Sequence, residues 1–97
     1  MEDREYLIIL YDYYGELLSD IQKDYFEQYY FDNLSLSEIS ENDGKSRNAI
    51  HKCIKSGCNK LYEYEEKLKL FEKRKKLDNI IKKIDDDLLK KELEELI

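Results

Sequence analysis

The 97-residue sequence contains no proline, no tryptophan and only three glycines. Because proline and glycine are the residues that most strongly interrupt helices, a chain with so few of them is predicted to be all-α. No segment approaches the roughly 20 consecutive apolar residues that a membrane-spanning helix needs. The residues after Met1 are mostly acidic, unlike the basic start of a secretory signal. We therefore expect a small cytoplasmic protein without membrane insertion.

Residues that bind metals or act in catalysis are also scarce and lack the required spacing. Cys53 and Cys58 lie five residues apart, on different faces of a helix, and His51 is the only histidine. We expect two reduced thiols, as is usual in the cytoplasm. The acidic run 85–87 is expected to cap a helix rather than to bind a cation. With no nucleophile beside a base and no glycine-rich phosphate loop, the sequence predicts a binding protein without a cofactor, not an enzyme.

Charge, in contrast, is abundant and unevenly distributed. Charged residues make up 41% of the sequence, and the formal net charge is −6. Residues 1–44 hold two basic and twelve acidic side chains, whereas residues 45–76 hold eleven basic and four acidic ones. Phosphate neutralisation supplies much of the affinity for nucleic acids, so the net charge opposes DNA binding while the basic segment permits it.

Apolar residues repeat at helical spacing along most of the chain. The pattern predicts one helix from Tyr6 to Leu18, a second capped by Ser19, and a third that is capped by Ser35 and ends near Asn42. The inward-facing residues of these helices are predicted to be Leu7, Leu10, Tyr14, Leu17, Ile21, Tyr25, Phe26, Tyr29, Tyr30, Leu36 and Ile39.

Residues Ser35 to Ile54 have the spacing of a helix-turn-helix. Gly44 supplies the left-handed conformation of a tight turn, and Ser46 caps the second helix. The inward residues of that helix are predicted to be Ala49, Ile50, Cys53 and Ile54. The helix is predicted to continue beyond the motif along an a/d seam formed by Ile50, Ile54, Gly57, Leu61, Tyr64, Leu68 and Phe71.

In DNA-binding versions of this motif, the start of the second helix meets phosphates and reads base edges in the major groove. Arginine suits guanine and asparagine suits adenine. The candidate nucleic-acid-binding residues are Lys45, Ser46, Arg47, Asn48, His51, Lys52 and Lys55, and a candidate second basic patch is Lys73, Arg74, Lys75 and Lys76. Such a charge run is about as often a solvated helix end, and the same motif also serves to dock proteins.

Four segments, taken in order, resemble the YlxM family of small bacterial helix-turn-helix proteins. They are residues 10–19 (LYDYYGELLS), 25–39 (YFEQYYFDNLSLSEI), 46–50 (SRNAI) and 61–68 (LYEYEEKL). The resemblance covers about residues 6–76. It implies a fold similar to region 4 of the sigma-70 factors and a link to the signal recognition particle pathway, proposed from gene neighbourhood with the GTPase of that particle and its receptor.

Three functional hypotheses follow. The first is a regulatory module that binds the GTPase or the RNA of the signal recognition particle. The second is a homodimeric, sequence-specific transcriptional regulator that pairs through the seam. The third is a structural protein whose long helix pairs with another helix. In each, residues 1–76 form the helix-turn-helix domain with its long helix, and residues 77–97 form a helical tail that packs on the domain or on a partner.

Overall fold

A computed structural model describes residues 3–97, and all the regular structure in that range is helical. The helices are α1 (Arg4–Tyr14), the 3-10 turn η1 (Gly15–Leu17), α2 (Asp20–Tyr30), α3 (Leu36–Asp43), α4 (Arg47–Leu68), α5 (Leu70–Ile81) and α6 (Asp87–Glu95). The all-α prediction is therefore confirmed. None of the helices in this range has both the length and the apolar character needed to cross a membrane.

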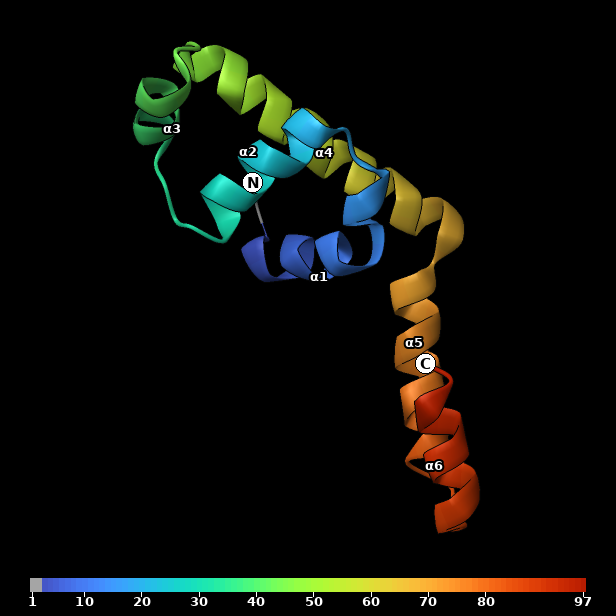
Figure 1. The fold of residues 1–97 in the computed structure, drawn as a ribbon. Helices are drawn as coiled ribbons and strands as arrows, with labels where there is room; N and C mark the ends of the chain where they lie inside the picture. Colours follow the sequence, from blue (N-terminus) through green and yellow to red (C-terminus); the bar gives the residue numbers. More distant parts are fainter. Residues whose placement is uncertain (1–2) are drawn as a thin grey trace.

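The molecule has two parts (Figure 1). Helices α1 to α4 form a body, while α5 and α6 form a hairpin that projects from the end of α4. This projection makes the molecule elongated, with extents of 56 × 24 × 22 Å. The predicted division at residue 76 lies inside α5, and the independence of the two parts stays a prediction.

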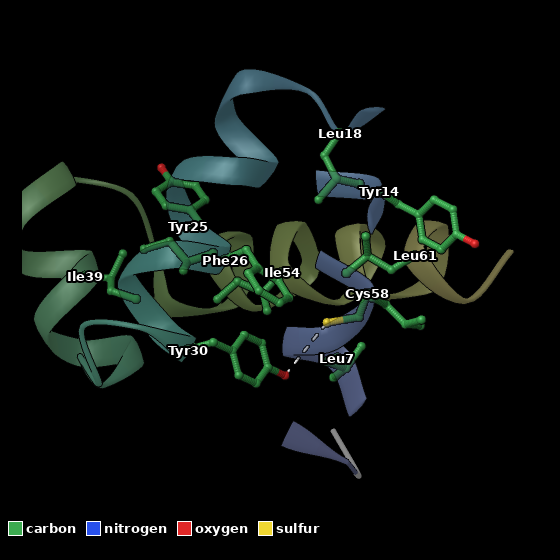
Figure 2. Packing of buried hydrophobic residues seen from close by; sticks show 12 residues of the cluster. Leu7, Tyr14, Leu18, Tyr25, Phe26, Tyr30, Ile39, Ile54, Cys58 and Leu61 are labelled. Atoms are coloured by element: carbon green, nitrogen blue, oxygen red, sulfur yellow. Dashed lines mark hydrogen bonds between the residues drawn. The ribbon is translucent and has the colours of Figure 1, made fainter. Parts of the chain in front are cut away.

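The core of the body forms where α1, α2 and α3 pack on α4 (Figure 2). Its buried residues are Leu7, Leu10, Tyr14, Leu18, Tyr25, Phe26, Tyr30, Ile39, Ile50, Ile54, Cys58 and Leu61. The first half of the predicted seam on α4, from Ile50 to Leu61, is thus buried. It is covered by helices of the same chain, so it does not offer a pairing surface to a second copy.

Three predicted inward residues are exposed instead. Helix α1 ends at Tyr14 and continues as a 3-10 turn, whose tighter winding shifts the next buried position from Leu17 to Leu18. In α2, Gln22 rather than Ile21 faces α4, and its Nε2 donates a hydrogen bond to Ser56 Oγ at 3.1 Å. Ala49 is also exposed, whereas its neighbour Ile50 is buried.

The prediction of one helix running to Phe71 is wrong. Helix α4 ends at Leu68, because Lys69 adopts the left-handed conformation with φ of 55°. Phe71 therefore belongs to α5, and its ring packs against the rings of Tyr6 and Tyr13 on α1, with centroids 5.9 and 6.1 Å apart. The chain bends at Lys69. As a result, the first part of α5 packs against α1 and does not continue the apolar seam of α4.

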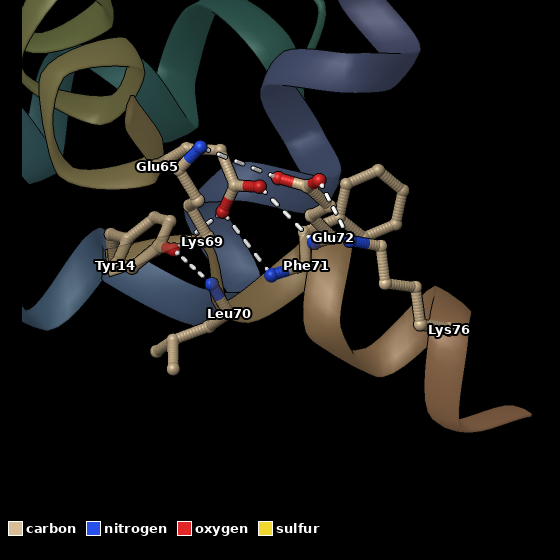
Figure 3. A network of polar contacts seen from close by, with 7 residues as sticks. All are labelled: Tyr14, Glu65, Lys69, Leu70, Phe71, Glu72 and Lys76. Atoms are coloured by element: carbon tan, nitrogen blue, oxygen red, sulfur yellow. Dashed lines mark hydrogen bonds and ion pairs between the residues drawn. The ribbon is translucent and has the colours of Figure 1, made fainter. Parts of the chain in front are cut away.

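The bend is fixed by a polar network at the start of α5 (Figure 3). The buried carboxylate of Glu65 accepts hydrogen bonds from the amides of Phe71 and Glu72, at 3.1 and 3.2 Å. The hydroxyl of Tyr14 donates to Glu65 at 2.5 Å and accepts from the amide of Leu70 at 3.0 Å. These three amides lie in the first turn of a helix and have no partner within it. Two side chains from other helices therefore cap α5.

The hairpin is held by fewer contacts than the body. Only Ile81 is buried in α5, and no residue of α6 is buried. Asp86 caps α6 by accepting hydrogen bonds from the amides of Leu88 and Leu89, at 3.0 and 3.1 Å. This confirms that the acidic run 85–87 starts the final helix.

Candidate nucleic-acid interface

Helices α3 and α4 meet at a tight corner. Gly44 has φ of 73°, and its amide donates to the carbonyl of Ser40 at 2.9 Å, closing the last turn of α3. Ser46 then caps α4 through its hydroxyl. Ile39 and Ile50 are fully buried on either side of this corner and set the angle between the helices. The predicted helix-turn-helix between Ser35 and Ile54 is confirmed as a structure.

The corner is anchored from behind by α2. The hydroxyl of Tyr25 donates a hydrogen bond to the carboxylate of Asp43, the last residue of α3. The ammonium of Lys45 lies 5.6 Å from the centroid of the Tyr25 ring and 4.0 Å from Asp43 Oδ2. Burial and the hydrogen bond to Asp43 raise the pKa of Tyr25, so its hydroxyl stays a donor. Lys45 is thus partly engaged within the protein.

The structure brings the candidate residues of α4 together on one face. All seven candidates from residue 45 to residue 55 are solvent-exposed. Five of them lie within the first nine residues of α4, and their spacing confines them to one side of the helix. They are Arg47, Asn48, His51, Lys52 and Lys55. Within residues 3–97, none of these five side chains takes part in a hydrogen bond or an ion pair. We call this set the α4 face.

The second predicted basic patch is not joined to the α4 face. Its residues, Lys73 to Lys76, lie on α5, beyond the bend and far from the start of α4 (Figure 1). Three of its cations have partners on their own helix, and Lys75 lies 5.3 Å from the centroid of the Phe71 ring. Arg74 pairs with Asp78 at 3.2 Å, and Lys76 pairs with Glu72 at 3.3 Å. The basic charge of residues 45–76 is therefore split between two surfaces.

The other helix of the motif, α3, carries acidic residues on its surface. Glu38, Glu41 and Asp43 are all exposed on that helix. The carboxylate of Glu38 accepts a hydrogen bond from the amide of Ser35 at 3.0 Å, which holds its pKa below the usual range. A charged α3 repels phosphates, whereas the first helix of many such motifs contacts the DNA backbone.

The whole chain, residues 1–97, matches the family model described as "Putative helix-turn-helix protein, YlxM / p13 like". The protein belongs to the UPF0122 family. It is 42% identical over 93 residues to a UPF0122 protein of Ureaplasma urealyticum, covering 96% of this chain and 94% of the relative. For a relative in Fusobacterium nucleatum the identity is 41% over 88 residues (91% and 85% covered), and for one in Clostridium novyi it is 50% over 91 residues (89% and 78% covered).

The family match confirms the resemblance to YlxM proteins and extends it through the α5–α6 hairpin, where the sequence motifs did not reach.

The capping role of Glu65 in this UPF0122 protein was not predicted from the sequence. A signal for it was present, because Glu65 falls on the same helical face as Leu61 and Leu68. A carboxylate within an apolar stripe is costly unless hydrogen-bonded, and the partners of Glu65 are the Tyr14 hydroxyl and two backbone amides of α5, which only the tertiary structure brings near.

The two cysteines lie in or against the core of the body. Cys53 is half-buried and Cys58 is buried, and no disulfide joins them. Burial raises the pKa of the Cys53 thiol. The hydroxyl of Tyr30 lies 3.8 Å from the sulfur of Cys58 inside the core (Figure 2). Across residues 3–97, no group of His, Cys, Asp and Glu side chains has an arrangement that would hold a metal ion.

Proposed function

We propose that this UPF0122 protein is a regulatory module that binds nucleic acid through the α4 face. The observation that carries the proposal is the set of five polar side chains on one exposed side of α4, none of them engaged elsewhere in the described residues. Three of these side chains, Arg47, Lys52 and Lys55, carry positive charge at neutral pH. They directly follow a helix N-terminus, which favours anions.

Duplex DNA is the ligand that suits this face best. The major groove of B-DNA admits an α-helix, whereas the deep and narrow major groove of A-form RNA does not. In such a complex Arg47 and Asn48, at the tip of α4, reach base edges, and Lys52 and Lys55 contact phosphates.

The resemblance to YlxM proteins adds a cellular setting, the cytoplasmic signal recognition particle pathway. In that setting the ligand is the RNA or the GTPase of the particle. The acidic surface of α1 to α3 would suit a basic protein partner, since residues 1–44 hold twelve acidic side chains and two basic ones. A pull-down from a bacterial lysate, with and without nuclease, distinguishes binding to the RNA from binding to the GTPase. Recovery of the GTPase after nuclease treatment indicates protein contact, and recovery lost on treatment indicates nucleic acid.

As a sequence-specific transcriptional regulator, the protein would act as a homodimer, because one short recognition helix seldom provides enough affinity for DNA. The seam from Ile50 to Leu61 is not its interface, because α1 and α2 already cover it. Any dimer must therefore form through a different surface.

Fluorescence anisotropy with a labelled random-sequence DNA duplex and a labelled RNA hairpin tests the proposal. We expect binding to the duplex that weakens steeply between roughly 50 and 200 mM salt. Arg47→Ala/Lys52→Ala should lower the affinity at least about tenfold, because two charge-assisted contacts are lost.

The matched control is Lys60→Ala/Lys67→Ala, which removes the same charge from the other half of α4. It should change the affinity by less than about twofold. Absence of binding to either probe at low salt, or equal losses in the two double variants, would contradict the proposal. Preferential binding of the RNA hairpin would assign the α4 face to RNA.

A further inference from the structure

Ala49 is an exposed apolar residue in the first turn of α4, with polar residues around it on the helix surface. The apolar spacing predicted it in the core together with Ile50 and Ile54. Both isoleucines are fully buried, whereas Ala49 faces solvent. Alanine also favours helices, so its exposure alone assigns it no role. The residues beside it do.

Helical spacing places Ala49 among the residues that the proposed function assigns to DNA. Asn48 and Ala49 precede Lys52 by four and three residues, so they lie on either side of it, one turn nearer the start of α4. All three are exposed. Within the described part of the chain, the side chains of Asn48 and Lys52 have no hydrogen-bond or ion-pair partner. An amide, a methyl group and an ammonium therefore form one small surface that is free to meet a ligand.

An amide next to a methyl group matches the major-groove edge of A·T base pairs. Asparagine binds the N6 and N7 atoms of adenine through two hydrogen bonds, and the alanine methyl packs on the C5 methyl of thymine. A G·C pair presents no methyl group in this groove. The Cα atoms of successive residues are about 3.8 Å apart, close to the spacing of about 3.4 Å between stacked base pairs. Asn48 and Ala49 thus suit two neighbouring A·T pairs.

We propose that Asn48 and Ala49 determine which DNA sequence the α4 face prefers. Asn48 reads an adenine, and Ala49 packs on the methyl group of a thymine in a neighbouring pair. Lys52 and Lys55 contact phosphates and contribute affinity for every sequence. The inference rests on the proposed function and adds to it the class of target, a duplex with adjacent A·T pairs.

Selection from a library of randomised DNA duplexes, followed by sequencing of the bound fraction, tests the assignment of Asn48. The enriched sequences should share two neighbouring A·T pairs, and a different base in place of the adenine should lower the affinity at least about fivefold. Asn48→Ala should lose this preference. The matched control is Asn59→Ala, which makes the same change at an exposed position about three turns further along α4 and should keep it.

The contact of Ala49 is tested by replacing the thymine of an enriched duplex with deoxyuridine, which removes the methyl group and leaves the base pairing unchanged. The affinity of the wild-type protein should fall about two- to fivefold. Ala49→Gly should bind the two duplexes equally. The wild-type response requires no variant, so it tests the contact even if Ala49→Gly destabilises the start of α4.

Fluorescence anisotropy of the same proteins with the random-sequence duplex separates this inference from the proposed function. Binding to that duplex without an enriched A·T motif, or without a response to deoxyuridine, would overturn the inference and leave the proposed function standing. An adenine preference that Asn48→Ala retains, or that Asn59→Ala loses equally, would overturn the assignment to Asn48. Absence of duplex binding at low salt would overturn both.

Discussion

The body and the hairpin are built from similar amphipathic helices, yet they bury their apolar stripes to very different degrees. In the body, nine large side chains from α1 to α4 are fully buried, whereas Ile81 is the one hydrophobic residue buried in the described hairpin. The difference lies in coverage. Helix α4 is packed by α1, α2 and α3, whereas α6 packs on α5. An apolar stripe therefore predicts which side of a helix will be buried, but not whether anything buries it.

Polar contacts follow the same division. In the body, Tyr25 of α2 donates to Asp43 of α3, and Tyr14 of α1 donates to Glu65 of α4. These bonds join different helices, between residues that are 18 and 51 positions apart in the sequence. In the hairpin, the ion pairs of α5 lie within the helix itself, at a spacing of four residues. Such exposed local pairs contribute little to stability, so we expect the body to determine the global free energy of unfolding.

The largest expected effect tests this division directly. Leu61→Ala removes a fully buried side chain from α4 and should lower the free energy of unfolding by about 2–5 kcal/mol. Leu88→Ala makes the same change at an exposed position of α6 and should cost less than about 0.5 kcal/mol. Urea denaturation at concentrations where the chain is monomeric measures both. Similar losses in the two variants would show that the hairpin is as tightly packed as the body.

The bend that connects the body to the hairpin depends on the carboxylate of Glu65. Glu65→Ala leaves the amides of Phe71 and Glu72 without their acceptor and should cost about 1–3 kcal/mol. Hydrogen exchange of these amides should accelerate, while that of the core of α4 changes less. The control is Glu66→Ala, an exposed carboxylate on the next residue. Unchanged exchange in Glu65→Ala would mean that the carboxylate does not hold the bend.

The tyrosines that respond to alkaline pH all lie in the body, because residues 70–97 contain no tyrosine. Burial, and then the hydrogen bond to Glu65, raise the pKa of Tyr14 to about 12 from an ordinary value of 10.0. Between these pH values the unfolded chain has lost a proton that the folded chain keeps. Stability is therefore present below pH 10 and falls as pH rises towards 12, by about 1–3 kcal/mol for this group.

Urea denaturation across that pH range measures the fall. Burial also raises the pKa values of Tyr11 and Tyr30, so the wild-type protein should lose stability more steeply than Tyr14 alone would cause. Tyr14→Phe should be less stable at neutral pH but less sensitive to alkali. An equally steep slope in that variant would contradict the assignment to Tyr14.

The smallest expected effects concern two glycines of the body and have opposite signs. Gly44→Ala places a side chain at φ of 73° and should cost about 1 kcal/mol at the helix-turn-helix corner. Gly57→Ala should stabilise α4 by up to about 1 kcal/mol, because a Cβ there would lie 3.6 Å from its nearest neighbour, the Gln22 Cβ. Thermal unfolding of both variants measures the difference. Destabilisation by Gly57→Ala would show that α2 and α4 need the close approach that glycine permits.

Most of the fold was predictable because its determinants are local. The capping boxes at Ser19 and Ser35 and the turn at Gly44 depend on residues at most a few positions apart, and the structure contains all of them. The start of α4 and the exposure of its polar residues follow from the same local rules. The ligand of the α4 face stays a prediction, because a helix surface suited to DNA is also suited to other partners.

The sequence by itself determined that this protein is all-α, where the serine N-caps of α2, α3 and α4 lie and which residues flank the helix-turn-helix corner, because propensity, capping and periodicity act over a few residues. Only the tertiary structure decided that α4 ends at Leu68, that Leu18 rather than Leu17 enters the core, and that the seam is covered from within the chain. The bend at Lys69 requires a carboxylate and a phenol that are brought to α5 by α4 and by α1. Such long-range contacts form only once the chain has folded, so the local pattern places the carboxylate of Glu65 in an apolar stripe but does not identify its partners.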